Sequence, residues 1–346
     1  MPSTESQQNR LKEWFPHTSK PFIANAPMLG FADYRLATAV TKAGGLGFIG
    51  GAFDFSPSST QLAKLDSELI KARTELGITD SGTLPIGVGF ITFTPSGFEE
   101  NVVPLLEKHR VSAVWLSFPK EDADHGPLIH AIRDARVKSE WSVKVFVQAG
   151  TVQGAATAAE QGADVIVVQG TDAGGHQWAR GASLLSLLPD VRGSLGDVYD
   201  VALLAAGGIV GGEGVCCCVG SRRGWDCYGD EAPASIKDSI VKAQDGAFST
   251  VKSVRHDVFQ STDVFPRQYD GRALVGISWN DAQSGVSDEE VIRRYDEAIK
   301  QGDDHRRTVW AGASVGSISS VLSVSDLMEQ IQQEVKLTTA SIMGCI

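Results

Sequence analysis

A histidine that directly follows two adjacent glycines is the residue whose surroundings most clearly favour chemistry. It lies in the stretch VVQGTDAGGHQWARG (residues 167–181), in which an apolar run ends in glutamine and leads to Gly174, Gly175 and His176. Glycines lack side chains, so this loop can approach a planar cofactor closely. An imidazole has an unperturbed pKa near neutrality and can take up a proton without strong activation. The stretch therefore makes His176 a candidate for proton transfer.

Two residues of this stretch have alternative interpretations. His176 taken alone is more typical of a hydrogen-bonded loop histidine, and the flanking QGTDAGGH motif reverses that preference and favours the catalytic role. Asp172 either orients the loop or the imidazole, or caps the N-terminus of the next helix. The other histidines stand in polar or helical contexts and are expected to be solvated; they are His17, His109, His125, His130, His256 and His305.

The sequence around His176 predicts repeated βα units, whose strands and helices would position this residue. Short apolar runs alternate with segments of helical periodicity, which indicates a parallel sheet covered by helices. Strands are predicted at 21–28, 45–50, 84–90, 112–118, 143–150, 163–170 and 201–208, and helices at 34–43, 99–108, 126–136 and 152–161. Several of these strands end in Gly, Gln or Asn at the edge that carries chemistry in barrels. The predicted fold class is α/β, a TIM (β/α)8-type barrel.

The pattern of strands fails where an eighth strand should follow. Residues 215–231, VCCCVGSRRGWDCYGDE, contain no β-branched run, so the eighth strand and its phosphate loop are expected to be disrupted. Beyond them, 236–246 and 287–303 are predicted to be helical and 248–259 to be extended. We expect one domain over 1–346 with a strand and helix excursion at about 232–310. A final helix would begin near Ser325 as its N-cap.

Composition and charge exclude several functional classes. The chain has 346 residues, of which 42% are hydrophobic and 21% charged, which is ordinary for a globular protein with a sizeable core. Its formal net charge of −11 disfavours nucleic acid and anionic membranes as partners. No apolar run approaches the length of a membrane span, and the N-terminus lacks a signal peptide's apolar region. A cytoplasmic location is therefore expected.

The cysteines favour neither disulfides nor a metal. Four of the five lie together at Cys216, Cys217, Cys218 and Cys227. Secreted disulfide frameworks have dispersed cysteines instead. Adjacent thiolates point apart, and the stretch has no CxxC pair, so a zinc site is disfavoured. No metal is expected.

Two further stretches place backbone where a cofactor could lie. Residues 25–51, NAPMLGFADYRLATAVTKAGGLGFIGG, predict a strand, a loop, a helix and a glycine-rich return, with the peptide groups of 26–28 facing a flat ring. Residues 205–209, AAGGI, end the seventh strand in two glycines, where barrels often place half of a phosphate-binding loop. Each motif alone is also typical of a tight turn.

Taken together, these motifs resemble a known family. The ordered set NAPM…ADYRLATAVTKAGGLGFIG, VQGTDAGGHQWARG, AAGGI, YDGRAL and VWAGASVGSI resembles the nitronate monooxygenases, formerly called 2-nitropropane dioxygenases, from about Pro21 to about Ser325. The resemblance implies FMN in a TIM barrel and the oxidation of alkyl nitronates by dioxygen to a carbonyl compound and nitrite. The implied partners are a nitronate or nitroalkane and dioxygen.

The resemblance also implies roles for individual residues. His176 matches the family's catalytic base beside the flavin. The positions matched to FMN, or to the loop that approaches it, are Ala26, Pro27, Met28, Gln148, Gln169, Gly174, Gly175, Gly207 and Gly208. One position departs from the family, because many members carry Asn where this chain has Gly89. A side-chain contact from that position is therefore absent.

Two other functions are compatible with the same motifs. A flavin-dependent enoyl-thioester reductase shares the barrel and the AGGH region but uses NAD(P)H, and no GxGxxG motif follows a strand here. A non-catalytic remnant without flavin would result if residues 215–231 abolish cofactor binding. The oligomeric state does not follow from the sequence.

Two interpretations of the aberrant segment 215–231 remain: a cysteine patch without function, or a change of reading frame over the codons for residues 215–232, which we favour. If its codons are read one nucleotide later, each Cys codon becomes Ala or Val, and one allowed reading is Ala-Ala-Ala-Leu-Gly-Ala-x-Gly-x-Gly-Ile-Ala-Met-Gly-Thr-Arg. That reading resembles the end of the helix, the eighth strand and the MGTR phosphate loop of the family. It falls where the barrel lacks a strand.

We predict that sequencing the transcript will show a compensated frame change flanking the codons for residues 215–231, because only the alternative frame restores the eighth strand. A transcript that encodes the cysteines in one continuous frame would reject this explanation.

Overall fold

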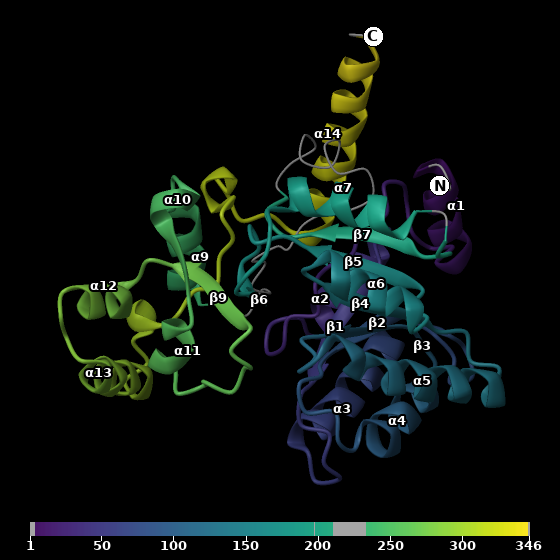
Figure 1. Cartoon of the computed structure of the whole chain (residues 1–346), viewed down its shortest axis with the longest axis horizontal. Coiled ribbons are helices and arrows are strands. Elements are labelled where there is room, and N and C mark those ends of the chain that lie inside the picture. Colours follow the sequence, from purple (N-terminus) through teal and green to yellow (C-terminus); the bar gives the residue numbers. More distant parts are fainter. Residues whose placement is uncertain (1–3, 197, 210–232, 345–346) are drawn as a thin grey trace.

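The computed structural model describes residues 4–196, 198–209 and 233–344. Figure 1 shows a parallel sheet wrapped by helices, with a second lobe of short helices and strands beside it. The frame-change hypothesis and the disrupted eighth strand, at 215–231, lie outside the described residues. Within the described residues, no helix is both long and apolar enough to cross a membrane.

Six parallel strands form the main sheet in the order β1-β2-β3-β4-β5-β7. They are β1 (Gly47–Ala52), β2 (Leu84–Ile91), β3 (Val111–Ser117), β4 (Lys144–Ala149), β5 (Val165–Gln169) and β7 (Ala202–Ala206). Neighbours in this sheet follow one another along the chain except for β6, which lies between β5 and β7 in sequence and leaves the sheet. Six of the seven predicted strands are thus confirmed, with shifted ends.

Two helices precede the first strand, and the others follow strands; apart from the first helix, whose Leu11 packs against the inner face, they lie on the outside of the sheet (Figure 1). They are α1 (Thr4–Trp14), α2 (Tyr34–Lys42), α3 (Thr60–Glu75), a π-helical turn η1 (Phe98–Val102) continuing into α4 (Val103–His109), a 3-10 turn η2 (Asp122–Asp124), α5 (His125–Ser139), α6 (Val152–Glu160) and α7 (Leu184–Leu195). The four helices expected from periodicity are confirmed, whereas α3 and α7 were not predicted.

The first predicted strand, at 21–28, is wrong as a regular strand. Only Ala24 forms a parallel bridge, to Leu46. Proline at 21 and 27 lacks a backbone N–H for a ladder. The Asn25 side chain takes over that pairing: its Oδ1 accepts a hydrogen bond from the Phe48 N–H (2.9 Å) and its Nδ2 donates to the Phe48 carbonyl (2.8 Å). The segment is therefore held against β1 by a side chain rather than by a ladder.

Hydrophobic residues pack on both faces of the main sheet and form two separate layers. Alternate strand residues on the inner face, including Phe48, Trp115 and Phe146, pack together with Leu11 and Phe15 at the N-terminal end of the chain. Phe48 meets Trp115 and Phe146 edge to face, with ring centroids 5.2 and 5.4 Å apart. The remaining strand residues pack against the covering helices. Aromatic packing fills the interior, so polar chemistry is confined to the strand ends.

The second lobe is built on an antiparallel sheet in the order β6-β9-β8. Its elements are β6 (Gly175–Trp178), α9 (Ala234–Lys242), α10 (Gly246–Ser249), β8 (Thr250–Ser253), α11 (Arg255–Phe259), β9 (Tyr269–Leu274), α12 (Ile277–Gln283), α13 (Asp288–Lys300), and the 3-10 turns η3 (Asp304–Arg306) and η4 (Val315–Ser317). The extended structure predicted for 248–259 is correct only for β8, because α11 follows it. The helix predicted at 287–303 is confirmed as α13, capped by Ser287.

The last helix, α14 (Val324–Gly344), rises from the top of the molecule in Figure 1. Leu327, Met328 and Ile331 attach it to Ile23. The predicted N-cap at Ser325 is wrong, because the Asp326 N–H donates to the hydroxyl of Ser323 (3.2 Å). The helix therefore begins before Ser325.

Three of the histidines expected to be solvated are buried. His109 contacts Asp66 (2.6 Å) and His256 contacts the Val251 carbonyl (3.1 Å), and both lie below the surface. His125 is also buried, with its Nε2 2.7 Å from the Thr92 Oγ1. That hydroxyl donates its hydrogen to the Ser117 carbonyl (2.9 Å), so it accepts one from Nε2. Burial lowers the pKa of His125 to about 3.

We predict that His125 makes the fold sensitive to acid. The unfolded chain binds a proton at this histidine below its usual pKa of about 6.5, whereas the folded chain does not until about pH 3. The contribution is complete above pH 6.5 and is lost progressively as the pH falls toward 3, by at most about 1.4 kcal/mol per pH unit. Denaturant unfolding should therefore show that the wild type loses more stability than His125→Gln between pH 6 and pH 4. If the free energy of unfolding of the two proteins changed equally between pH 6 and pH 4, the prediction would be contradicted.

Candidate active site

A chain of polar groups crosses the barrel mouth, the edge formed by the carboxyl ends of the parallel strands. The Trp115 indole N–H donates to the Gln148 Oε1 (3.1 Å), and the Gln148 Nε2 donates to the Gln169 Oε1 (3.1 Å). The Gln169 Nε2 then donates to the carbonyl of His176 (3.2 Å). Each glutamine amide keeps a second N–H that these bonds do not use. The structure thus brings Gln148, Gln169 and His176 together.

The other side of the mouth is built from glycines under the loop that follows Ala24. A Cβ at Gly50 would lie 2.5 Å from the Met28 carbonyl oxygen, and a Cβ at Gly89 would lie 2.2 Å from the Pro27 Cγ. The backbone of 26–28 therefore lies directly over β1 and β2. This contact explains why the chain has glycine at position 89, since an asparagine there would displace Pro27.

His176 is held by β6 rather than by an irregular loop. In the β6–β9 ladder, His176 is paired with Gly271. Its Nε2 lies 2.9 and 3.0 Å from the two carboxylate oxygens of Asp257, in α11. The His176 side chain is 17% exposed and that of Asp257 is 5% exposed. The imidazole therefore reaches solvent while its carboxylate partner does not.

Aromatic rings enclose the imidazole. Phe265 stacks on it with ring centroids 3.8 Å apart and planes 10° apart. Trp310 lies at 4.8 Å and Phe118 at 6.4 Å from the imidazole centroid. These rings leave an apolar surround for any small substrate that reaches His176.

Asp172 does not contact the imidazole through any hydrogen bond of the described residues. Its carboxylate accepts from the Ser183 hydroxyl (2.6 Å) and from the Leu184 N–H (3.2 Å), at the start of α7. Asp172 thus ties its own loop to the start of α7, whose N-cap is Ser183, and the partner of His176 is Asp257 instead.

The predicted phosphate-loop glycines lie in a crowded turn after β7. Gly207 and Gly208 both have positive φ, at 93° and 71°, which favours glycine. A Cβ at Gly208 would lie 2.3 Å from the Cβ of Asp172. The Gly208 carbonyl also accepts a hydrogen bond from the Ser314 hydroxyl (2.5 Å). This turn therefore packs directly on the loop that leads to His176.

Gly174 and Gly175 remain partly accessible, as do Ala26, Pro27, Met28 and Gln169. Gly175 has φ of 71°, and a Cβ there would meet nothing within 4 Å. Open glycine backbone, exposed peptide groups and free amide hydrogens are the features that a planar, polar-edged cofactor requires. The residues present at the mouth thus fit a flavin ring, and Gln148 lies deeper as a buried donor.

Sequence reasoning missed Asp257, Phe265 and Trp310. The closest signal was the motif VWAGASVGSI, which contains Trp310. Asp257 is 81 positions from His176 along the chain, so no local spacing connects them.

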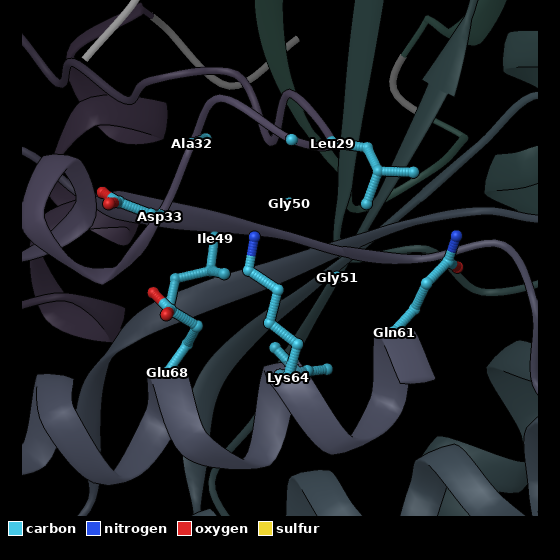
Figure 2. A pocket seen from close by; sticks show the side chains of 11 residues that line it. Leu29, Ala32, Asp33, Ile49, Gly50, Gly51, Gln61, Lys64 and Glu68 are labelled. Carbon is cyan, nitrogen blue, oxygen red and sulfur yellow. The ribbon is translucent and has the colours of Figure 1, made fainter. Parts of the chain in front are cut away.

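A separate cavity of about 220 Å³ lies behind the 26–33 loop, on the side of α3 (Figure 2). Figure 2 shows the Lys64 side chain reaching from α3 toward β1. The cavity is lined by Leu29, Gly30, Ala32, Asp33, Ile49, Gly50, Gly51, Gln61, Lys64, Leu65 and Glu68. The lining shares Gly50 with the mouth but contains none of His176, Gln148 and Gln169, so the candidate base lies outside this cavity.

Solved structures share this fold. FabK from Thermotoga maritima superposes with a TM-score of 0.72 over 97% of this chain and 99% of that chain, at 22% identity. A nitroalkane oxidase from Streptomyces ansochromogenes superposes with a TM-score of 0.69 over 96% and 99%, at 23% identity. This likeness confirms the predicted TIM (β/α)8-type barrel.

The sequence comparisons are more specific. Residues 132–220 match the family model for nitronate monooxygenase. The chain is 36% identical to a nitronate monooxygenase of Neurospora crassa, over 96% of this chain and 94% of that protein. It is 31% identical to the nitronate monooxygenase npaC of Metarhizium robertsii, over 96% of both. The chain therefore belongs to the nitronate monooxygenase family, a family of flavin-dependent oxidoreductases.

Proposed function

We propose that this protein binds FMN and uses dioxygen to oxidise alkyl nitronates, and the nitroalkanes from which they form, to a carbonyl compound and nitrite. The observation that carries the proposal is the position of His176. Its backbone carbonyl accepts a hydrogen bond from Gln169 at the carboxyl end of β5, and its imidazole is 17% exposed to solvent. Family membership supports the same chemistry.

The residues that would hold FMN surround the mouth. The amides of Gln148 and Gln169 and the backbone of 26–28 would bind the ring, and Gly174 and Gly175 would let the loop approach it. Gly207 and Gly208 would offer backbone N–H groups to the phosphate. When bound, FMN would supply the electron transfer from the nitronate to dioxygen.

Side chains of the protein would accept the substrate's proton and exclude water from the reacting carbon. A neutral nitroalkane must lose the proton from the carbon next to the nitro group, and His176 would accept that proton. Phe118, Phe265 and Trp310 would keep water away from the carbon. The chain itself thus supplies a base and an apolar surround.

Anaerobic mixing tests the reaction class. Protein purified with flavin should lose its flavin absorbance when a nitronate is added, because electrons enter the flavin from this substrate. NAD(P)H should leave the absorbance unchanged. A spectrophotometer under nitrogen suffices, and bleaching by NAD(P)H with no response to nitronate would favour the reductase.

His176→Asn tests the base. Asparagine cannot accept the proton at neutral pH, so turnover of the neutral nitroalkane should fall by about 10²- to 10⁴-fold. The preformed nitronate needs no deprotonation and should be spared. Nitrite release measures both rates, and His130→Asn, on the exposed face of α5, is the matched control. An equal loss on both substrates would remove the assignment of His176 as the base.

A further inference from the structure

We propose that Asp257 is a positioning residue that holds His176 in the tautomer with its proton on Nε2, so that Nδ1 is the atom that receives the substrate proton. This inference rests on the proposed role of His176 as the base. It gives the second lobe, which contains Asp257, a role in orienting the base.

The contact is close and nearly symmetric. The His176 Nε2 lies 2.9 Å from one Asp257 carboxylate oxygen and 3.0 Å from the other. An ionised carboxylate only accepts hydrogen bonds, so the nitrogen facing it must carry a hydrogen. A neutral imidazole has a single N–H, which leaves the lone pair on Nδ1. The hydrogen bond to Asp257 thus selects the nitrogen that acts as acceptor.

The backbone fixes where the carboxylate lies. Asp257 is in the short helix α11, where its N–H donates to the Val254 carbonyl (3.1 Å). Its own carbonyl accepts from the Gln260 N–H (3.1 Å) and the Thr262 N–H (3.0 Å). The neighbouring His256 turns away to bond the Val251 carbonyl (3.1 Å). Asp257 alone of this pair is thereby directed at His176.

The imidazole is also restrained across its face. Phe265 follows Asp257 in the same lobe and stacks on the ring at 3.8 Å. A ring flip about the Cβ–Cγ bond would put Cε1 in the place of Nε2 and Cδ2 in the place of Nδ1, so it would have to break the hydrogen bond to Asp257 while the ring stays within this stack. The hydrogen bond sets the tautomer, and the stacking holds the plane in which Nδ1 is presented.

The experiment compares Asp257→Asn with Asp257→Glu and Asp263→Asn in flavin-loaded protein. Asn is nearly isosteric, but its amide N–H₂ can donate to Nε2 and so favour the other tautomer. Asp263 is an exposed carboxylate of the same lobe and serves as the charge-matched control. Nitrite release is measured with neutral nitroethane and with its preformed nitronate.

We expect Asp257→Asn to lower kcat/KM for nitroethane by about 10²- to 10⁴-fold, as loss of the orienting carboxylate does for other catalytic histidines. The rate with the preformed nitronate should change by no more than about threefold, since no proton is removed. Asp257→Glu should recover part of the loss, and Asp263→Asn should match the wild type. Unchanged activity of Asp257→Asn, or an equal loss on both substrates, would overturn the proposal.

A second readout does not depend on turnover. Nitrogen NMR of the wild type labelled with ¹⁵N-histidine, with His176→Asn used to assign the signal, reports which ring nitrogen carries hydrogen. The expected result is a protonated Nε2 and a bare Nδ1 at the pH of the assay, and the reverse would contradict the proposal. If the wild type shows this tautomer but does not oxidise nitronates, the proposed function fails and the role of Asp257 in setting the tautomer stands.

Discussion

The candidate site depends on the antiparallel pairing of β6 with β9. This ladder takes the chain out of the main sheet immediately after β5 and attaches it to the second lobe. His176 is paired with Gly271, and a Cβ at Gly271 would lie 2.3 Å from Trp310. Glycine at 271 therefore lets Trp310 approach the strand beside the imidazole. Without this ladder, the barrel would present the two glutamines but no base.

The barrel and the lobe contribute different kinds of group. The barrel supplies a rigid floor, because aromatic packing of Phe48, Trp115 and Phe146 fills the interior below Gln148. Its mouth combines glycines beneath the 26–28 loop with amides on the opposite side. The lobe supplies Asp257 and the aromatic surround of His176. The groups that would bind a flat ligand thus come from the barrel, and those that would support proton transfer come from the second lobe. The two sets meet at β6.

The sequence predicted the parts of this arrangement that depend on local pattern. Apolar runs with strand periodicity gave β1 to β5 and β7, and the glycines before His176 indicated an accessible imidazole. Local pattern failed at 21–28, where Asn25 replaces a backbone ladder with side-chain hydrogen bonds. The local pattern also predicted wrongly that His125 is solvated. Its polar neighbours in sequence do not reveal that it is buried and hydrogen-bonded to Thr92. Asp257 could not be found, since its proximity to His176 is created by the pairing of β9 with both β6 and β8.

The most direct test of this account is a crystal structure of the protein with FMN bound. The account predicts that the isoalloxazine ring lies between the 26–28 backbone and the amides of Gln148 and Gln169, with the imidazole of His176 facing the substrate space beside it. A ring bound elsewhere, or a His176 side chain turned away from that space, would contradict it.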